Sequence, residues 1–416
     1  GDEYIDKVFQ QFPQVKDSVD FCAYWFRLAH QHLDEQGRAG LVATNSVSQG
    51  KSRVAALDYI TQNQGYIHEA VSTQPWSGEA KVHVSIVNWC KAKPGKYYLD
   101  DEVVSSINSS LKSSIDVSQA VRLKANLNKC FQGVIPIGKG FFVTEEQVKE
   151  WIKADGKNQE VLKLFSMGAN LAQNTHGKPE RWIIDFNDMS IEDASEYQLP
   201  FEHIKINVKP ERDNNRNAKA RDYWWNFFSH RPAMRKAISS LSYYFTVPRV
   251  SKWAIFIPAP LNWLPGDLNI VIASEDFYIL GILTSKIHRQ WVKAQSSTLK
   301  GDTRYTNTTC FETFPFPQTA TGEIVKKIRS KAVELHEYRT QEMESKQWGI
   351  TTLYNEFYNE PSSKLSKLHE QLDKLVMEAY KFQPEDDILE QLLKLNQELG
   401  KKESQNQQVI GPEAVN

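Results

Sequence analysis

Residues 39–46 read AGLVATNS, a short apolar run that ends in two small polar side chains, Asn45 and Ser46. A buried strand of a parallel sheet has this continuous apolar pattern, and the loop at its carboxyl end carries polar residues. Helical periodicity precedes the run over residues 19–36, and a second helical segment follows at about 51–63. This stretch therefore predicts an α/β arrangement.

The next segments complete one edge of the predicted sheet. Residues 66–72 and the alternating residues 81–89 are strand-like, and the loop between them carries Trp76. Helix–strand–helix–strand–strand is typical of the end of a doubly wound domain that closes on an antiparallel pair. His83, inside the alternating strand, is expected to pack in the core. The Gly-rich loop of a Rossmann-like cofactor site does not follow any strand here, and we expect the first half of the sheet to precede residue 1.

From about residue 121 the pattern changes to short segments separated by Gly and Pro. Strands are predicted at residues 181–186, 203–208, 268–273 and 277–280, with a long basic helix over 216–244 that breaks at Pro232. After Pro317 the periodicity is helical, and from 399 the chain is rich in Gln, Glu and Asn and is expected to be disordered. The predicted organisation is an α/β domain with a partial doubly wound sheet (1–120), a mixed α+β domain (121–318), an α-helical region (319–398) and a disordered tail (399–416).

The formal net charge of −1 conceals a basic block. Residues 205–305 hold 16 Lys and Arg against 7 Asp and Glu, the distribution expected of a module that binds a polyanion. The sequence has no apolar run of about 18 residues and no signal peptide, and its four cysteines are far apart without a CxxC pair. These features predict a cytoplasmic protein with reduced thiols, no membrane segment and no metal site.

Residues 296–306 read SSTLKGDTRYT, and they place two charges, Lys300 and Asp302, one residue apart in a turn. Lys is a hydrogen-bond donor and ionised Asp an acceptor, so the pair suits the major-groove edge of a G·C base pair. Lys300 would address guanine and Asp302 the amine of cytosine. A solvated turn with a local ion pair, worth at most about 1 kcal/mol, fits the same residues, and the residues alone leave both interpretations open.

Aromatic residues are interleaved with cations in the basic block. Base stacking by Trp224 or Trp225 is one interpretation, but we favour a place in the core for both. The cations are expected to contact DNA phosphates, and the candidates are Lys209, Arg212, Arg216, Lys219, Arg221, Arg231 and Arg235.

Several motifs lie in collinear order along the chain. They are DFCAYWF at 20–26, GLVATNS at 40–46, PWSGEA at 75–80, VHVS at 82–85, RWIIDF at 181–186, VKPER at 208–212, WW at 224–225 and the block 297–317. In these motifs the chain, up to about residue 380, resembles the MmeI-like (type IIL) restriction–modification enzymes.

The resemblance implies the C-terminal part of a polypeptide with a nuclease, an adenine-specific DNA methyltransferase and a target-recognition domain. The partners are then double-stranded DNA and the missing N-terminal half of the same polypeptide. S-adenosylmethionine would serve the methyltransferase and Mg²⁺ the nuclease of the intact enzyme. Because the sequence contains no Asn-Pro-Pro motif, this chain alone is not expected to hold S-adenosylmethionine well or to transfer methyl, and no catalytic or metal-binding residue is assigned.

The resemblance also gives roles to individual residues. Trp76 would stack on the flipped adenine, the alternative being a buried turn tryptophan. Lys300 and Asp302 fall where the family places base-reading side chains, whereas Arg304 and Ser297 would support the loop or contact phosphate. Two other functions stay open, namely a non-catalytic DNA-specificity subunit that works with a separate methylase chain, and an RNA-modification accessory that prefers single strands.

Overall fold

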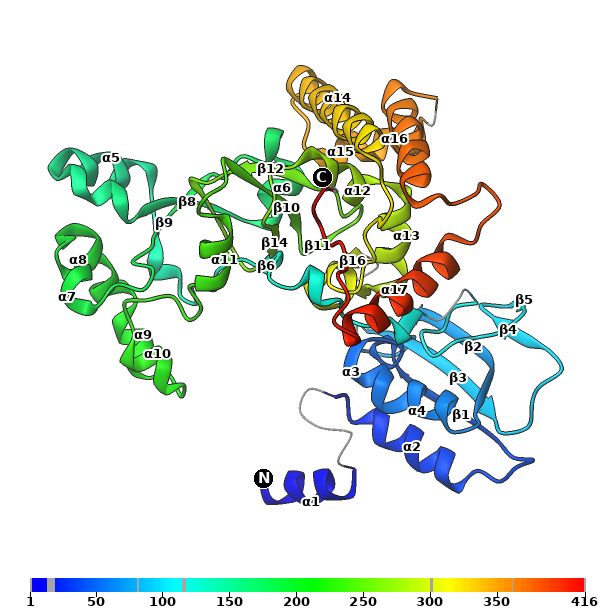
Figure 1. The fold of residues 1–416 in the computed structure, drawn as a ribbon. Helices are drawn as coiled ribbons and strands as arrows, with labels where there is room; N and C mark the ends of the chain where they lie inside the picture. Colours follow the sequence, from blue (N-terminus) through cyan, green and yellow to red (C-terminus); the bar gives the residue numbers. More distant parts are fainter. Residues whose placement is uncertain are drawn as a thin grey trace. The chain divides into compact units, whose positions relative to one another are not determined.

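A computed structural model of the 416-residue chain describes residues 2–12, 19–80, 82–113, 117–299, 302–360 and 362–414 (Figure 1). The chain divides into two compact units, residues 1–119 and residues 120–416. No helix among the described residues is long and apolar enough to cross a membrane.

Unit 1 combines a mixed sheet with short helices. Its helical segments are α1 (Asp2–Gln11), α2 (Cys22–His32), η1 (Asn45–Ser48), α3 (Gly50–Arg53), η2 (Val54–Asp58), α4 (Tyr59–Gln62) and η3 (Val117–Gln119). Its strands are β1 (Arg38–Thr44), β2 (Tyr66–Pro75), β3 (His83–Cys90), β4 (Tyr97–Leu99) and β5 (Glu102–Val104). The strand order is β1-β3-β2-β4-β5, and β3 runs antiparallel to both β1 and β2. This is the predicted closure on an antiparallel neighbour.

The core of unit 1 forms between this sheet and helix α2. The Phe26 ring of α2 stacks on Trp89 of β3 with the ring centroids 5.4 Å apart, and both side chains are buried. Val87 of the same strand and Ile60 of α4 are buried in the same cluster. His83 differs from the prediction because it opens β3 next to the loop that carries Trp76, where its side chain is exposed.

Unit 2 begins with two four-stranded sheets. The first has the order β12-β10-β14-β6, and the second has the order β13-β8-β9-β7. These strands are β6 (Cys130–Gln132), β7 (Phe142–Val143), β8 (Leu162–Ser166), β9 (Arg181–Ile184), β10 (Tyr243–Pro248), β12 (Ile257–Pro260), β13 (Trp263–Pro265) and β14 (Asn269–Ile272). A third, antiparallel sheet has the order β11-β16-β15 and consists of β11 (Val250–Ser251), β15 (Ser297–Leu299) and β16 (Asp302–Arg304).

The helices of unit 2 surround these sheets and then form the C-terminal region (Figure 1). The earlier helices are η4 (Lys124–Asn126), η5 (Lys139–Phe141), α5 (Glu145–Ala154), η6 (Gly156–Glu160), α6 (Gly168–Gln173), η7 (Thr175–Gly177), α7 (Ile191–Ser195), α8 (Gln198–Asn207), α9 (Lys209–Asp213), α10 (Ala218–Asp222), α11 (Pro232–Ile238), α12 (Phe277–Thr284), α13 (Lys286–Gln295) and η8 (Asn307–Phe311). The later helices are α14 (Gly322–Lys346), α15 (Ile350–Asn359), α16 (Lys364–Tyr380) and α17 (Ile388–Ser404). Helix α14 packs against α12 and α16, so the fold class is the predicted α/β part followed by a mixed part and a helical region.

Several predicted elements of unit 2 are wrong. Residues 203–208 form the end of helix α8 rather than a strand, and 277–280 begin helix α12, where the Asp276 carboxylate accepts from the Tyr278 N–H. The long helix over 216–244 is instead α10, α11 and strand β10. It is interrupted because Trp224 and Trp225 turn into the core, as expected for these two side chains.

The disorder expected from residue 399 is wrong for residues 399–414, and residues 415 and 416 lie outside the described residues. Beyond the last helix, the Ile410 N–H donates to Gln318 Oε1 at 3.0 Å and the Ile410 carbonyl oxygen accepts from Gln318 Nε2 at 2.8 Å. Helix α17 continues to Ser404, and Leu399 is fully buried. The Glu403 carboxylate accepts the backbone N–H groups of Lys124 and Ala125 at 2.7 and 2.8 Å. Although the composition of α17 is mostly polar, its buried residues lie on one face, and that face packs the last turns of the helix against the rest of unit 2.

Candidate nucleic-acid interface

The antiparallel sheet β11-β16-β15 carries the predicted base-reading segment. Strand β16 lies between β15 and β11, and its register pairs Arg304 with Ser297 on one side and with Val250 on the other. Asp302 and Arg304 are exposed on this strand. Lys300 lies outside the described residues, and the side chain of Ser297 is not described.

The strand register brings two residues to this site that the sequence analysis missed. The Tyr305 N–H donates to the Arg249 carbonyl oxygen at 2.8 Å, so Arg249 lies beside Arg304. The Arg249 N–H in turn donates to the Leu268 carbonyl oxygen at 2.7 Å, which brings the neighbouring Asp267 to the same place. A signal was present for Asp267, since residues 265–267 read PGD, a turn motif between two apolar strands.

Arg231 completes a cluster that we call the arginine cluster, defined as Arg231, Arg249 and Arg304 with Asp267. Burial and the nearby positive charges of Arg304 and Arg231 lower the pKa of Arg249, while Asp267 acts in the opposite direction. Arg231 is held by the Gly133 carbonyl oxygen and the Gln132 amide oxygen, both at 3.1 Å. Among the described residues, the guanidinium groups of Arg249 and Arg304 form no hydrogen bond, although the Asp267 carboxylate lies near Arg249. Three cations next to a single carboxylate form a site that favours an anion.

A buried group of aromatic rings attaches strand β16 to the core. Tyr305 is fully buried, and its hydroxyl and His288 Nε2 share a hydrogen bond of 3.0 Å. The Phe256 ring meets Tyr305 edge-on with the ring centroids 5.4 Å apart. Burial lowers the pKa of His288 to about 3, so the imidazole is neutral. The hairpin that carries Asp302 and Arg304 is therefore attached to the core through the next residue in the sequence.

The structure corrects two of the seven predicted phosphate contacts. Arg212 is only 2% exposed, and it donates to the carbonyl oxygens of Pro136, Ile137 and Asn226. Arg235 is part-buried against Asp185, with an Nη1–Oδ2 distance of 2.9 Å. Both guanidinium groups are committed to the protein itself, so they hold the fold together and are not available to DNA phosphates.

The other predicted phosphate contacts lie near the surface. Arg216, Lys219 and Arg221 are exposed around helix α10, whereas Lys209 is half-buried in an ion pair with Asp213 at 2.7 Å. Arg221 also donates to the Asn215 and Arg216 carbonyl oxygens. Exposed cations of this kind can reach phosphate without breaking the core.

Trp76 of unit 1 stands at the end of β2, and its indole is 46% exposed. The backbone N–H of Trp76 donates to the Val82 carbonyl oxygen at 2.9 Å, and this bond closes the loop at its base. A Cβ at Gly78 would lie 2.4 Å from the indole Nε1, so a residue without a side chain is needed there. The alternative of a buried turn tryptophan is therefore wrong, because the residue is nearly half exposed.

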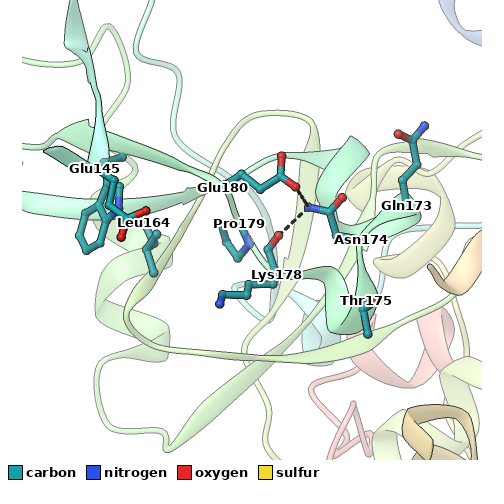
Figure 2. A pocket seen from close by; sticks show the side chains of 9 residues that line it. Glu145, Leu164, Gln173, Asn174, Thr175, Lys178, Pro179 and Glu180 are labelled. Atoms are coloured by element: carbon teal, nitrogen blue, oxygen red, sulfur yellow. Dashed lines mark hydrogen bonds between the residues drawn. The ribbon is translucent and has the colours of Figure 1, made fainter. Parts of the chain in front are cut away.

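A pocket elsewhere in unit 2 does not contain any of these residues. It has a volume of about 720 Å³ and is lined by Asn174, Lys178, Glu180 and Trp182 among others (Figure 2). The Asn174 amide donates to the Lys178 carbonyl oxygen and to the Glu180 carboxylate across its floor. Within the part of the chain that the structure describes, no group of three or more His, Cys, Asp or Glu side chains is placed to hold a metal ion.

Comparisons with known proteins define the class. Residues 2–99 match the family model "MmeI, DNA-methyltransferase domain", and residues 112–318 match "MmeI, target recognition domain". The fold and these matches define a protein with a methyltransferase part followed by a target-recognition part. The chain belongs to the MmeI-like family of type IIL restriction–modification enzymes.

Two similar proteins extend the comparison. DNA methyltransferase A of Bacillus subtilis (strain 168) is 28% identical over 423 residues, which cover 95% of this chain and 46% of that protein. The structure of the type IIL restriction–modification enzyme MmeI in complex with DNA has a TM-score of 0.78 at 20% identity and covers 95% of this chain and 55% of that one. The second likeness shows the fold. The chain spans about half the length of each of these proteins.

Proposed function

We propose that this chain recognises a specific sequence of double-stranded DNA within a restriction–modification methyltransferase that modifies adenine. The arginine cluster beside Asp302 is the observation that supports the proposal most strongly. Guanidinium groups bind phosphate, and a carboxylate accepts from the amine of cytosine. Strand β16 carries Asp302 and Arg304 together, and Arg249 lies beside Arg304 and Arg231. The family membership supplies the DNA context.

Lys300 and Asp302 are proposed to read one G·C pair, with guanine at the base addressed by Lys300. Arg304 and Ser297 are proposed to support the loop or to contact phosphate. Arg216, Lys219, Arg221, Arg231 and Lys209 are proposed to contribute to phosphate binding. Trp76 is proposed to stack on the flipped adenine, because an exposed aromatic side chain beside a loop suits an unstacked base.

The methyl donor proposed for the intact protein is S-adenosylmethionine. The described residues of unit 1 do not form a complete site for this cofactor, since no Gly-rich loop follows β1 or β2. Large apolar side chains such as Phe21, Trp25 and Val42 are more than half exposed in unit 1. We propose that the remaining methyltransferase polypeptide covers such surfaces, and that Mg²⁺ serves a nuclease outside this chain.

The test is selection of bound duplexes from a randomised library at two salt concentrations, followed by sequencing of the retained DNA. Enrichment of one short motif with an adenine and a fixed G·C pair is the expected result. Binding that depends on salt but not on sequence would contradict specific recognition, because phosphate contacts alone give that behaviour.

A charge-swapped variant sharpens the test. Lys300→Glu with Asp302→Arg should reverse the order of the preferred G·C pair or abolish the preference, because each misplaced charge costs about 1–3 kcal/mol when it is desolvated without a partner. The matched control is Glu370→Arg with Lys374→Glu on α16, which swaps two exposed charges far along the chain. An unchanged base preference in the first variant would refute the assignment.

A further inference from the structure

The segment that follows strand β11 is tied to the C-terminal helices. Residues 252–256 connect β11, the partner of the recognition strand β16, to β12. Lys252 Nζ and the Trp253 indole N–H both donate to Oδ1 of Asn355 on α15, at 2.9 and 3.2 Å. Ala254 adopts a left-handed φ of +48°, so the backbone of this connection is held in a conformation that it would not adopt by itself.

A second tie runs through the buried ring group. The Phe256 ring contacts Tyr305. The backbone carbonyl oxygen of Phe256 accepts from Arg339 Nη2 of α14 at 3.5 Å. Arg339 is 1% exposed, and its Nη1 donates to the Tyr354 hydroxyl at 3.1 Å. The Tyr354 hydroxyl also bonds His369 Nε2 of α16 at 2.7 Å.

Arg339 is a cation whose burial in the core costs free energy. Burying a cation costs more free energy than burying an apolar side chain of the same volume. The hydrogen bonds of a buried cation fix the geometry of its neighbours rather than add net stability. Within the described residues, this guanidinium has no carboxylate partner. The network therefore specifies where α14, α15 and α16 stand relative to the backbone at Phe256.

A third connection to the C-terminal helices restrains strand β15, on the other side of β16. Helix α13 leads directly into β15, and its first N–H, at Lys286, donates to Oδ1 of Asp373 on α16 at 2.6 Å. Arg289 of α13 faces the same carboxylate, with an Nη2–Oδ2 distance of 3.8 Å. Both flanks of the recognition strand are thus connected to the same set of helices.

We infer that helices α14–α16 position the sheet β11-β16-β15 and its arginine cluster, and that Asn355 and Arg339 are positioning residues for sequence recognition. The inference rests on the proposed function for its consequence in DNA binding. Base readout needs its side chains within about 0.5 Å of the productive geometry. Three strands of only two or three residues each cannot provide that rigidity alone, and the helical region supplies the support.

The first test is hydrogen–deuterium exchange of the free 416-residue chain carrying Asn355→Ala. Loss of the shared acceptor should raise the exchange of amides at residues 250–256 and 302–305 about tenfold, because two hydrogen bonds that restrain the connection are lost. Asn355→Asp keeps an acceptor oxygen and should restore the slow exchange. Glu356→Ala, at an exposed neighbour on the same helix, is the matched control and should leave it unchanged.

Two results would overturn the inference. One is unchanged exchange at both segments in Asn355→Ala. The other is faster exchange spread evenly over unit 2 together with a lower Tm, which would show a general role in stability.

The second test compares the affinity for the library-selected duplex with that for a scrambled duplex. Asn355→Ala should lower the ratio of these affinities about tenfold while binding to the scrambled duplex stays the same, and Asn355→Asp should recover the ratio. An unchanged ratio would contradict the inference. If the wild-type chain shows no sequence preference at all, the proposed function fails, whereas the exchange experiment still decides whether the helices hold the strands.

Discussion

Tyr305 and His288 form a buried hydrogen bond without charge, and Tyr305 directly follows Arg304 of the arginine cluster in the chain. Their hydrogen bond of 3.0 Å joins a fully buried hydroxyl to an imidazole whose other nitrogen, Nδ1, has no partner among the described residues. A protonated imidazole at this position would be a buried positive charge without an acceptor to compensate it. Neutral polar groups therefore suit the support of a cationic site.

The stability of unit 2 should depend on pH through His288. Burial lowers its folded-state pKa to about 3, against about 6.5 in an unfolded chain. The unfolded state therefore binds more protons between these values, so the stability is complete above about pH 6.5 and is lost as the pH falls toward 3, by up to about 1.4 kcal/mol per pH unit for this group.

Urea unfolding of His288→Gln at several pH values tests this. The variant is expected to be less stable than wild type at pH 7.5, but its free energy of unfolding should decrease less steeply between pH 6.5 and 4.5. His32→Gln, at an exposed histidine, should keep the wild-type slope. Equal slopes for wild type and His288→Gln would show that His288 is not the group responsible.

Trp76 provides a prediction for the intact methyltransferase. If its exposed indole stacks on the flipped adenine, Trp76→Ala should weaken binding of a duplex with 2-aminopurine at the target position by about 1–3 kcal/mol. The fluorescence increase that reports the flipped base should change as well. Trp76→Phe should retain most of the binding, and Tyr98→Ala, at an exposed aromatic residue of β4, should retain all of it. A normal affinity and fluorescence signal in Trp76→Ala would exclude stacking at this position.

At the scale of elements, the sequence predicted unit 1 better than unit 2. The strands β1, β2 and β3 were found from the apolar run of β1, the strand-like residues of β2 and the alternation of β3. The prediction that β1 is a buried strand of a parallel sheet is wrong, because β1 pairs antiparallel with β3 and most of its side chains are not buried. In unit 2, residues 203–208 alternate polar and apolar side chains and residues 277–280 are a short apolar run. Neither pattern separates a short strand from one end of a helix. The packing around Phe201 and Tyr278, both buried, decides in favour of helices.

The arginine cluster shows why the site was only partly predictable. Asp302 and Arg304 lie on one strand, so the sequence alone groups them. Arg249 and Asp267 come from other segments, and only the register of β11 with β16 and the bond from Arg249 to Leu268 bring them together. Arg212 illustrates the reverse error, since a cation in a basic stretch turned out to bond backbone carbonyls in the core.

Helix α17 gives a prediction at this scale. Glu403 satisfies two backbone N–H groups of η4, at Lys124 and Ala125, and is only 7% exposed. Glu403→Ala should therefore lower the free energy of unfolding by about 2–4 kcal/mol, because two part-buried hydrogen bonds lose their charged acceptor. Glu398→Ala on the same helix removes only an exposed ion pair with Lys402 and should cost less than about 0.5 kcal/mol. Thermal or chemical unfolding measures both, and equal effects would mean that α17 is not docked through this carboxylate.

At the scale of the whole molecule, the positive and negative charges are nearly equal in number but unevenly distributed along the chain. A chain with a net charge of −1 does not attract DNA through its total charge, so binding must come from the basic block between residues 205 and 305. The structure divides that block into cations that hold the fold, such as Arg212 and Arg235, and exposed cations such as Arg216 and Lys219. Only the second group can release counterions from DNA.

This division predicts how the affinity for DNA depends on salt. The logarithm of the affinity falls linearly with the logarithm of the salt concentration, with a slope of about −0.9 for each phosphate contacted. Arg216→Ala with Lys219→Ala should therefore reduce the slope by about 2 and should weaken binding to selected and scrambled duplexes equally, because phosphates carry no sequence information. Lys367→Ala with Lys374→Ala removes the same charge from exposed positions on α16 and should leave the slope unchanged. A loss confined to the selected duplex would instead assign Arg216 or Lys219 to base readout, and equal slopes in all three proteins would place the phosphate contacts elsewhere in the basic block.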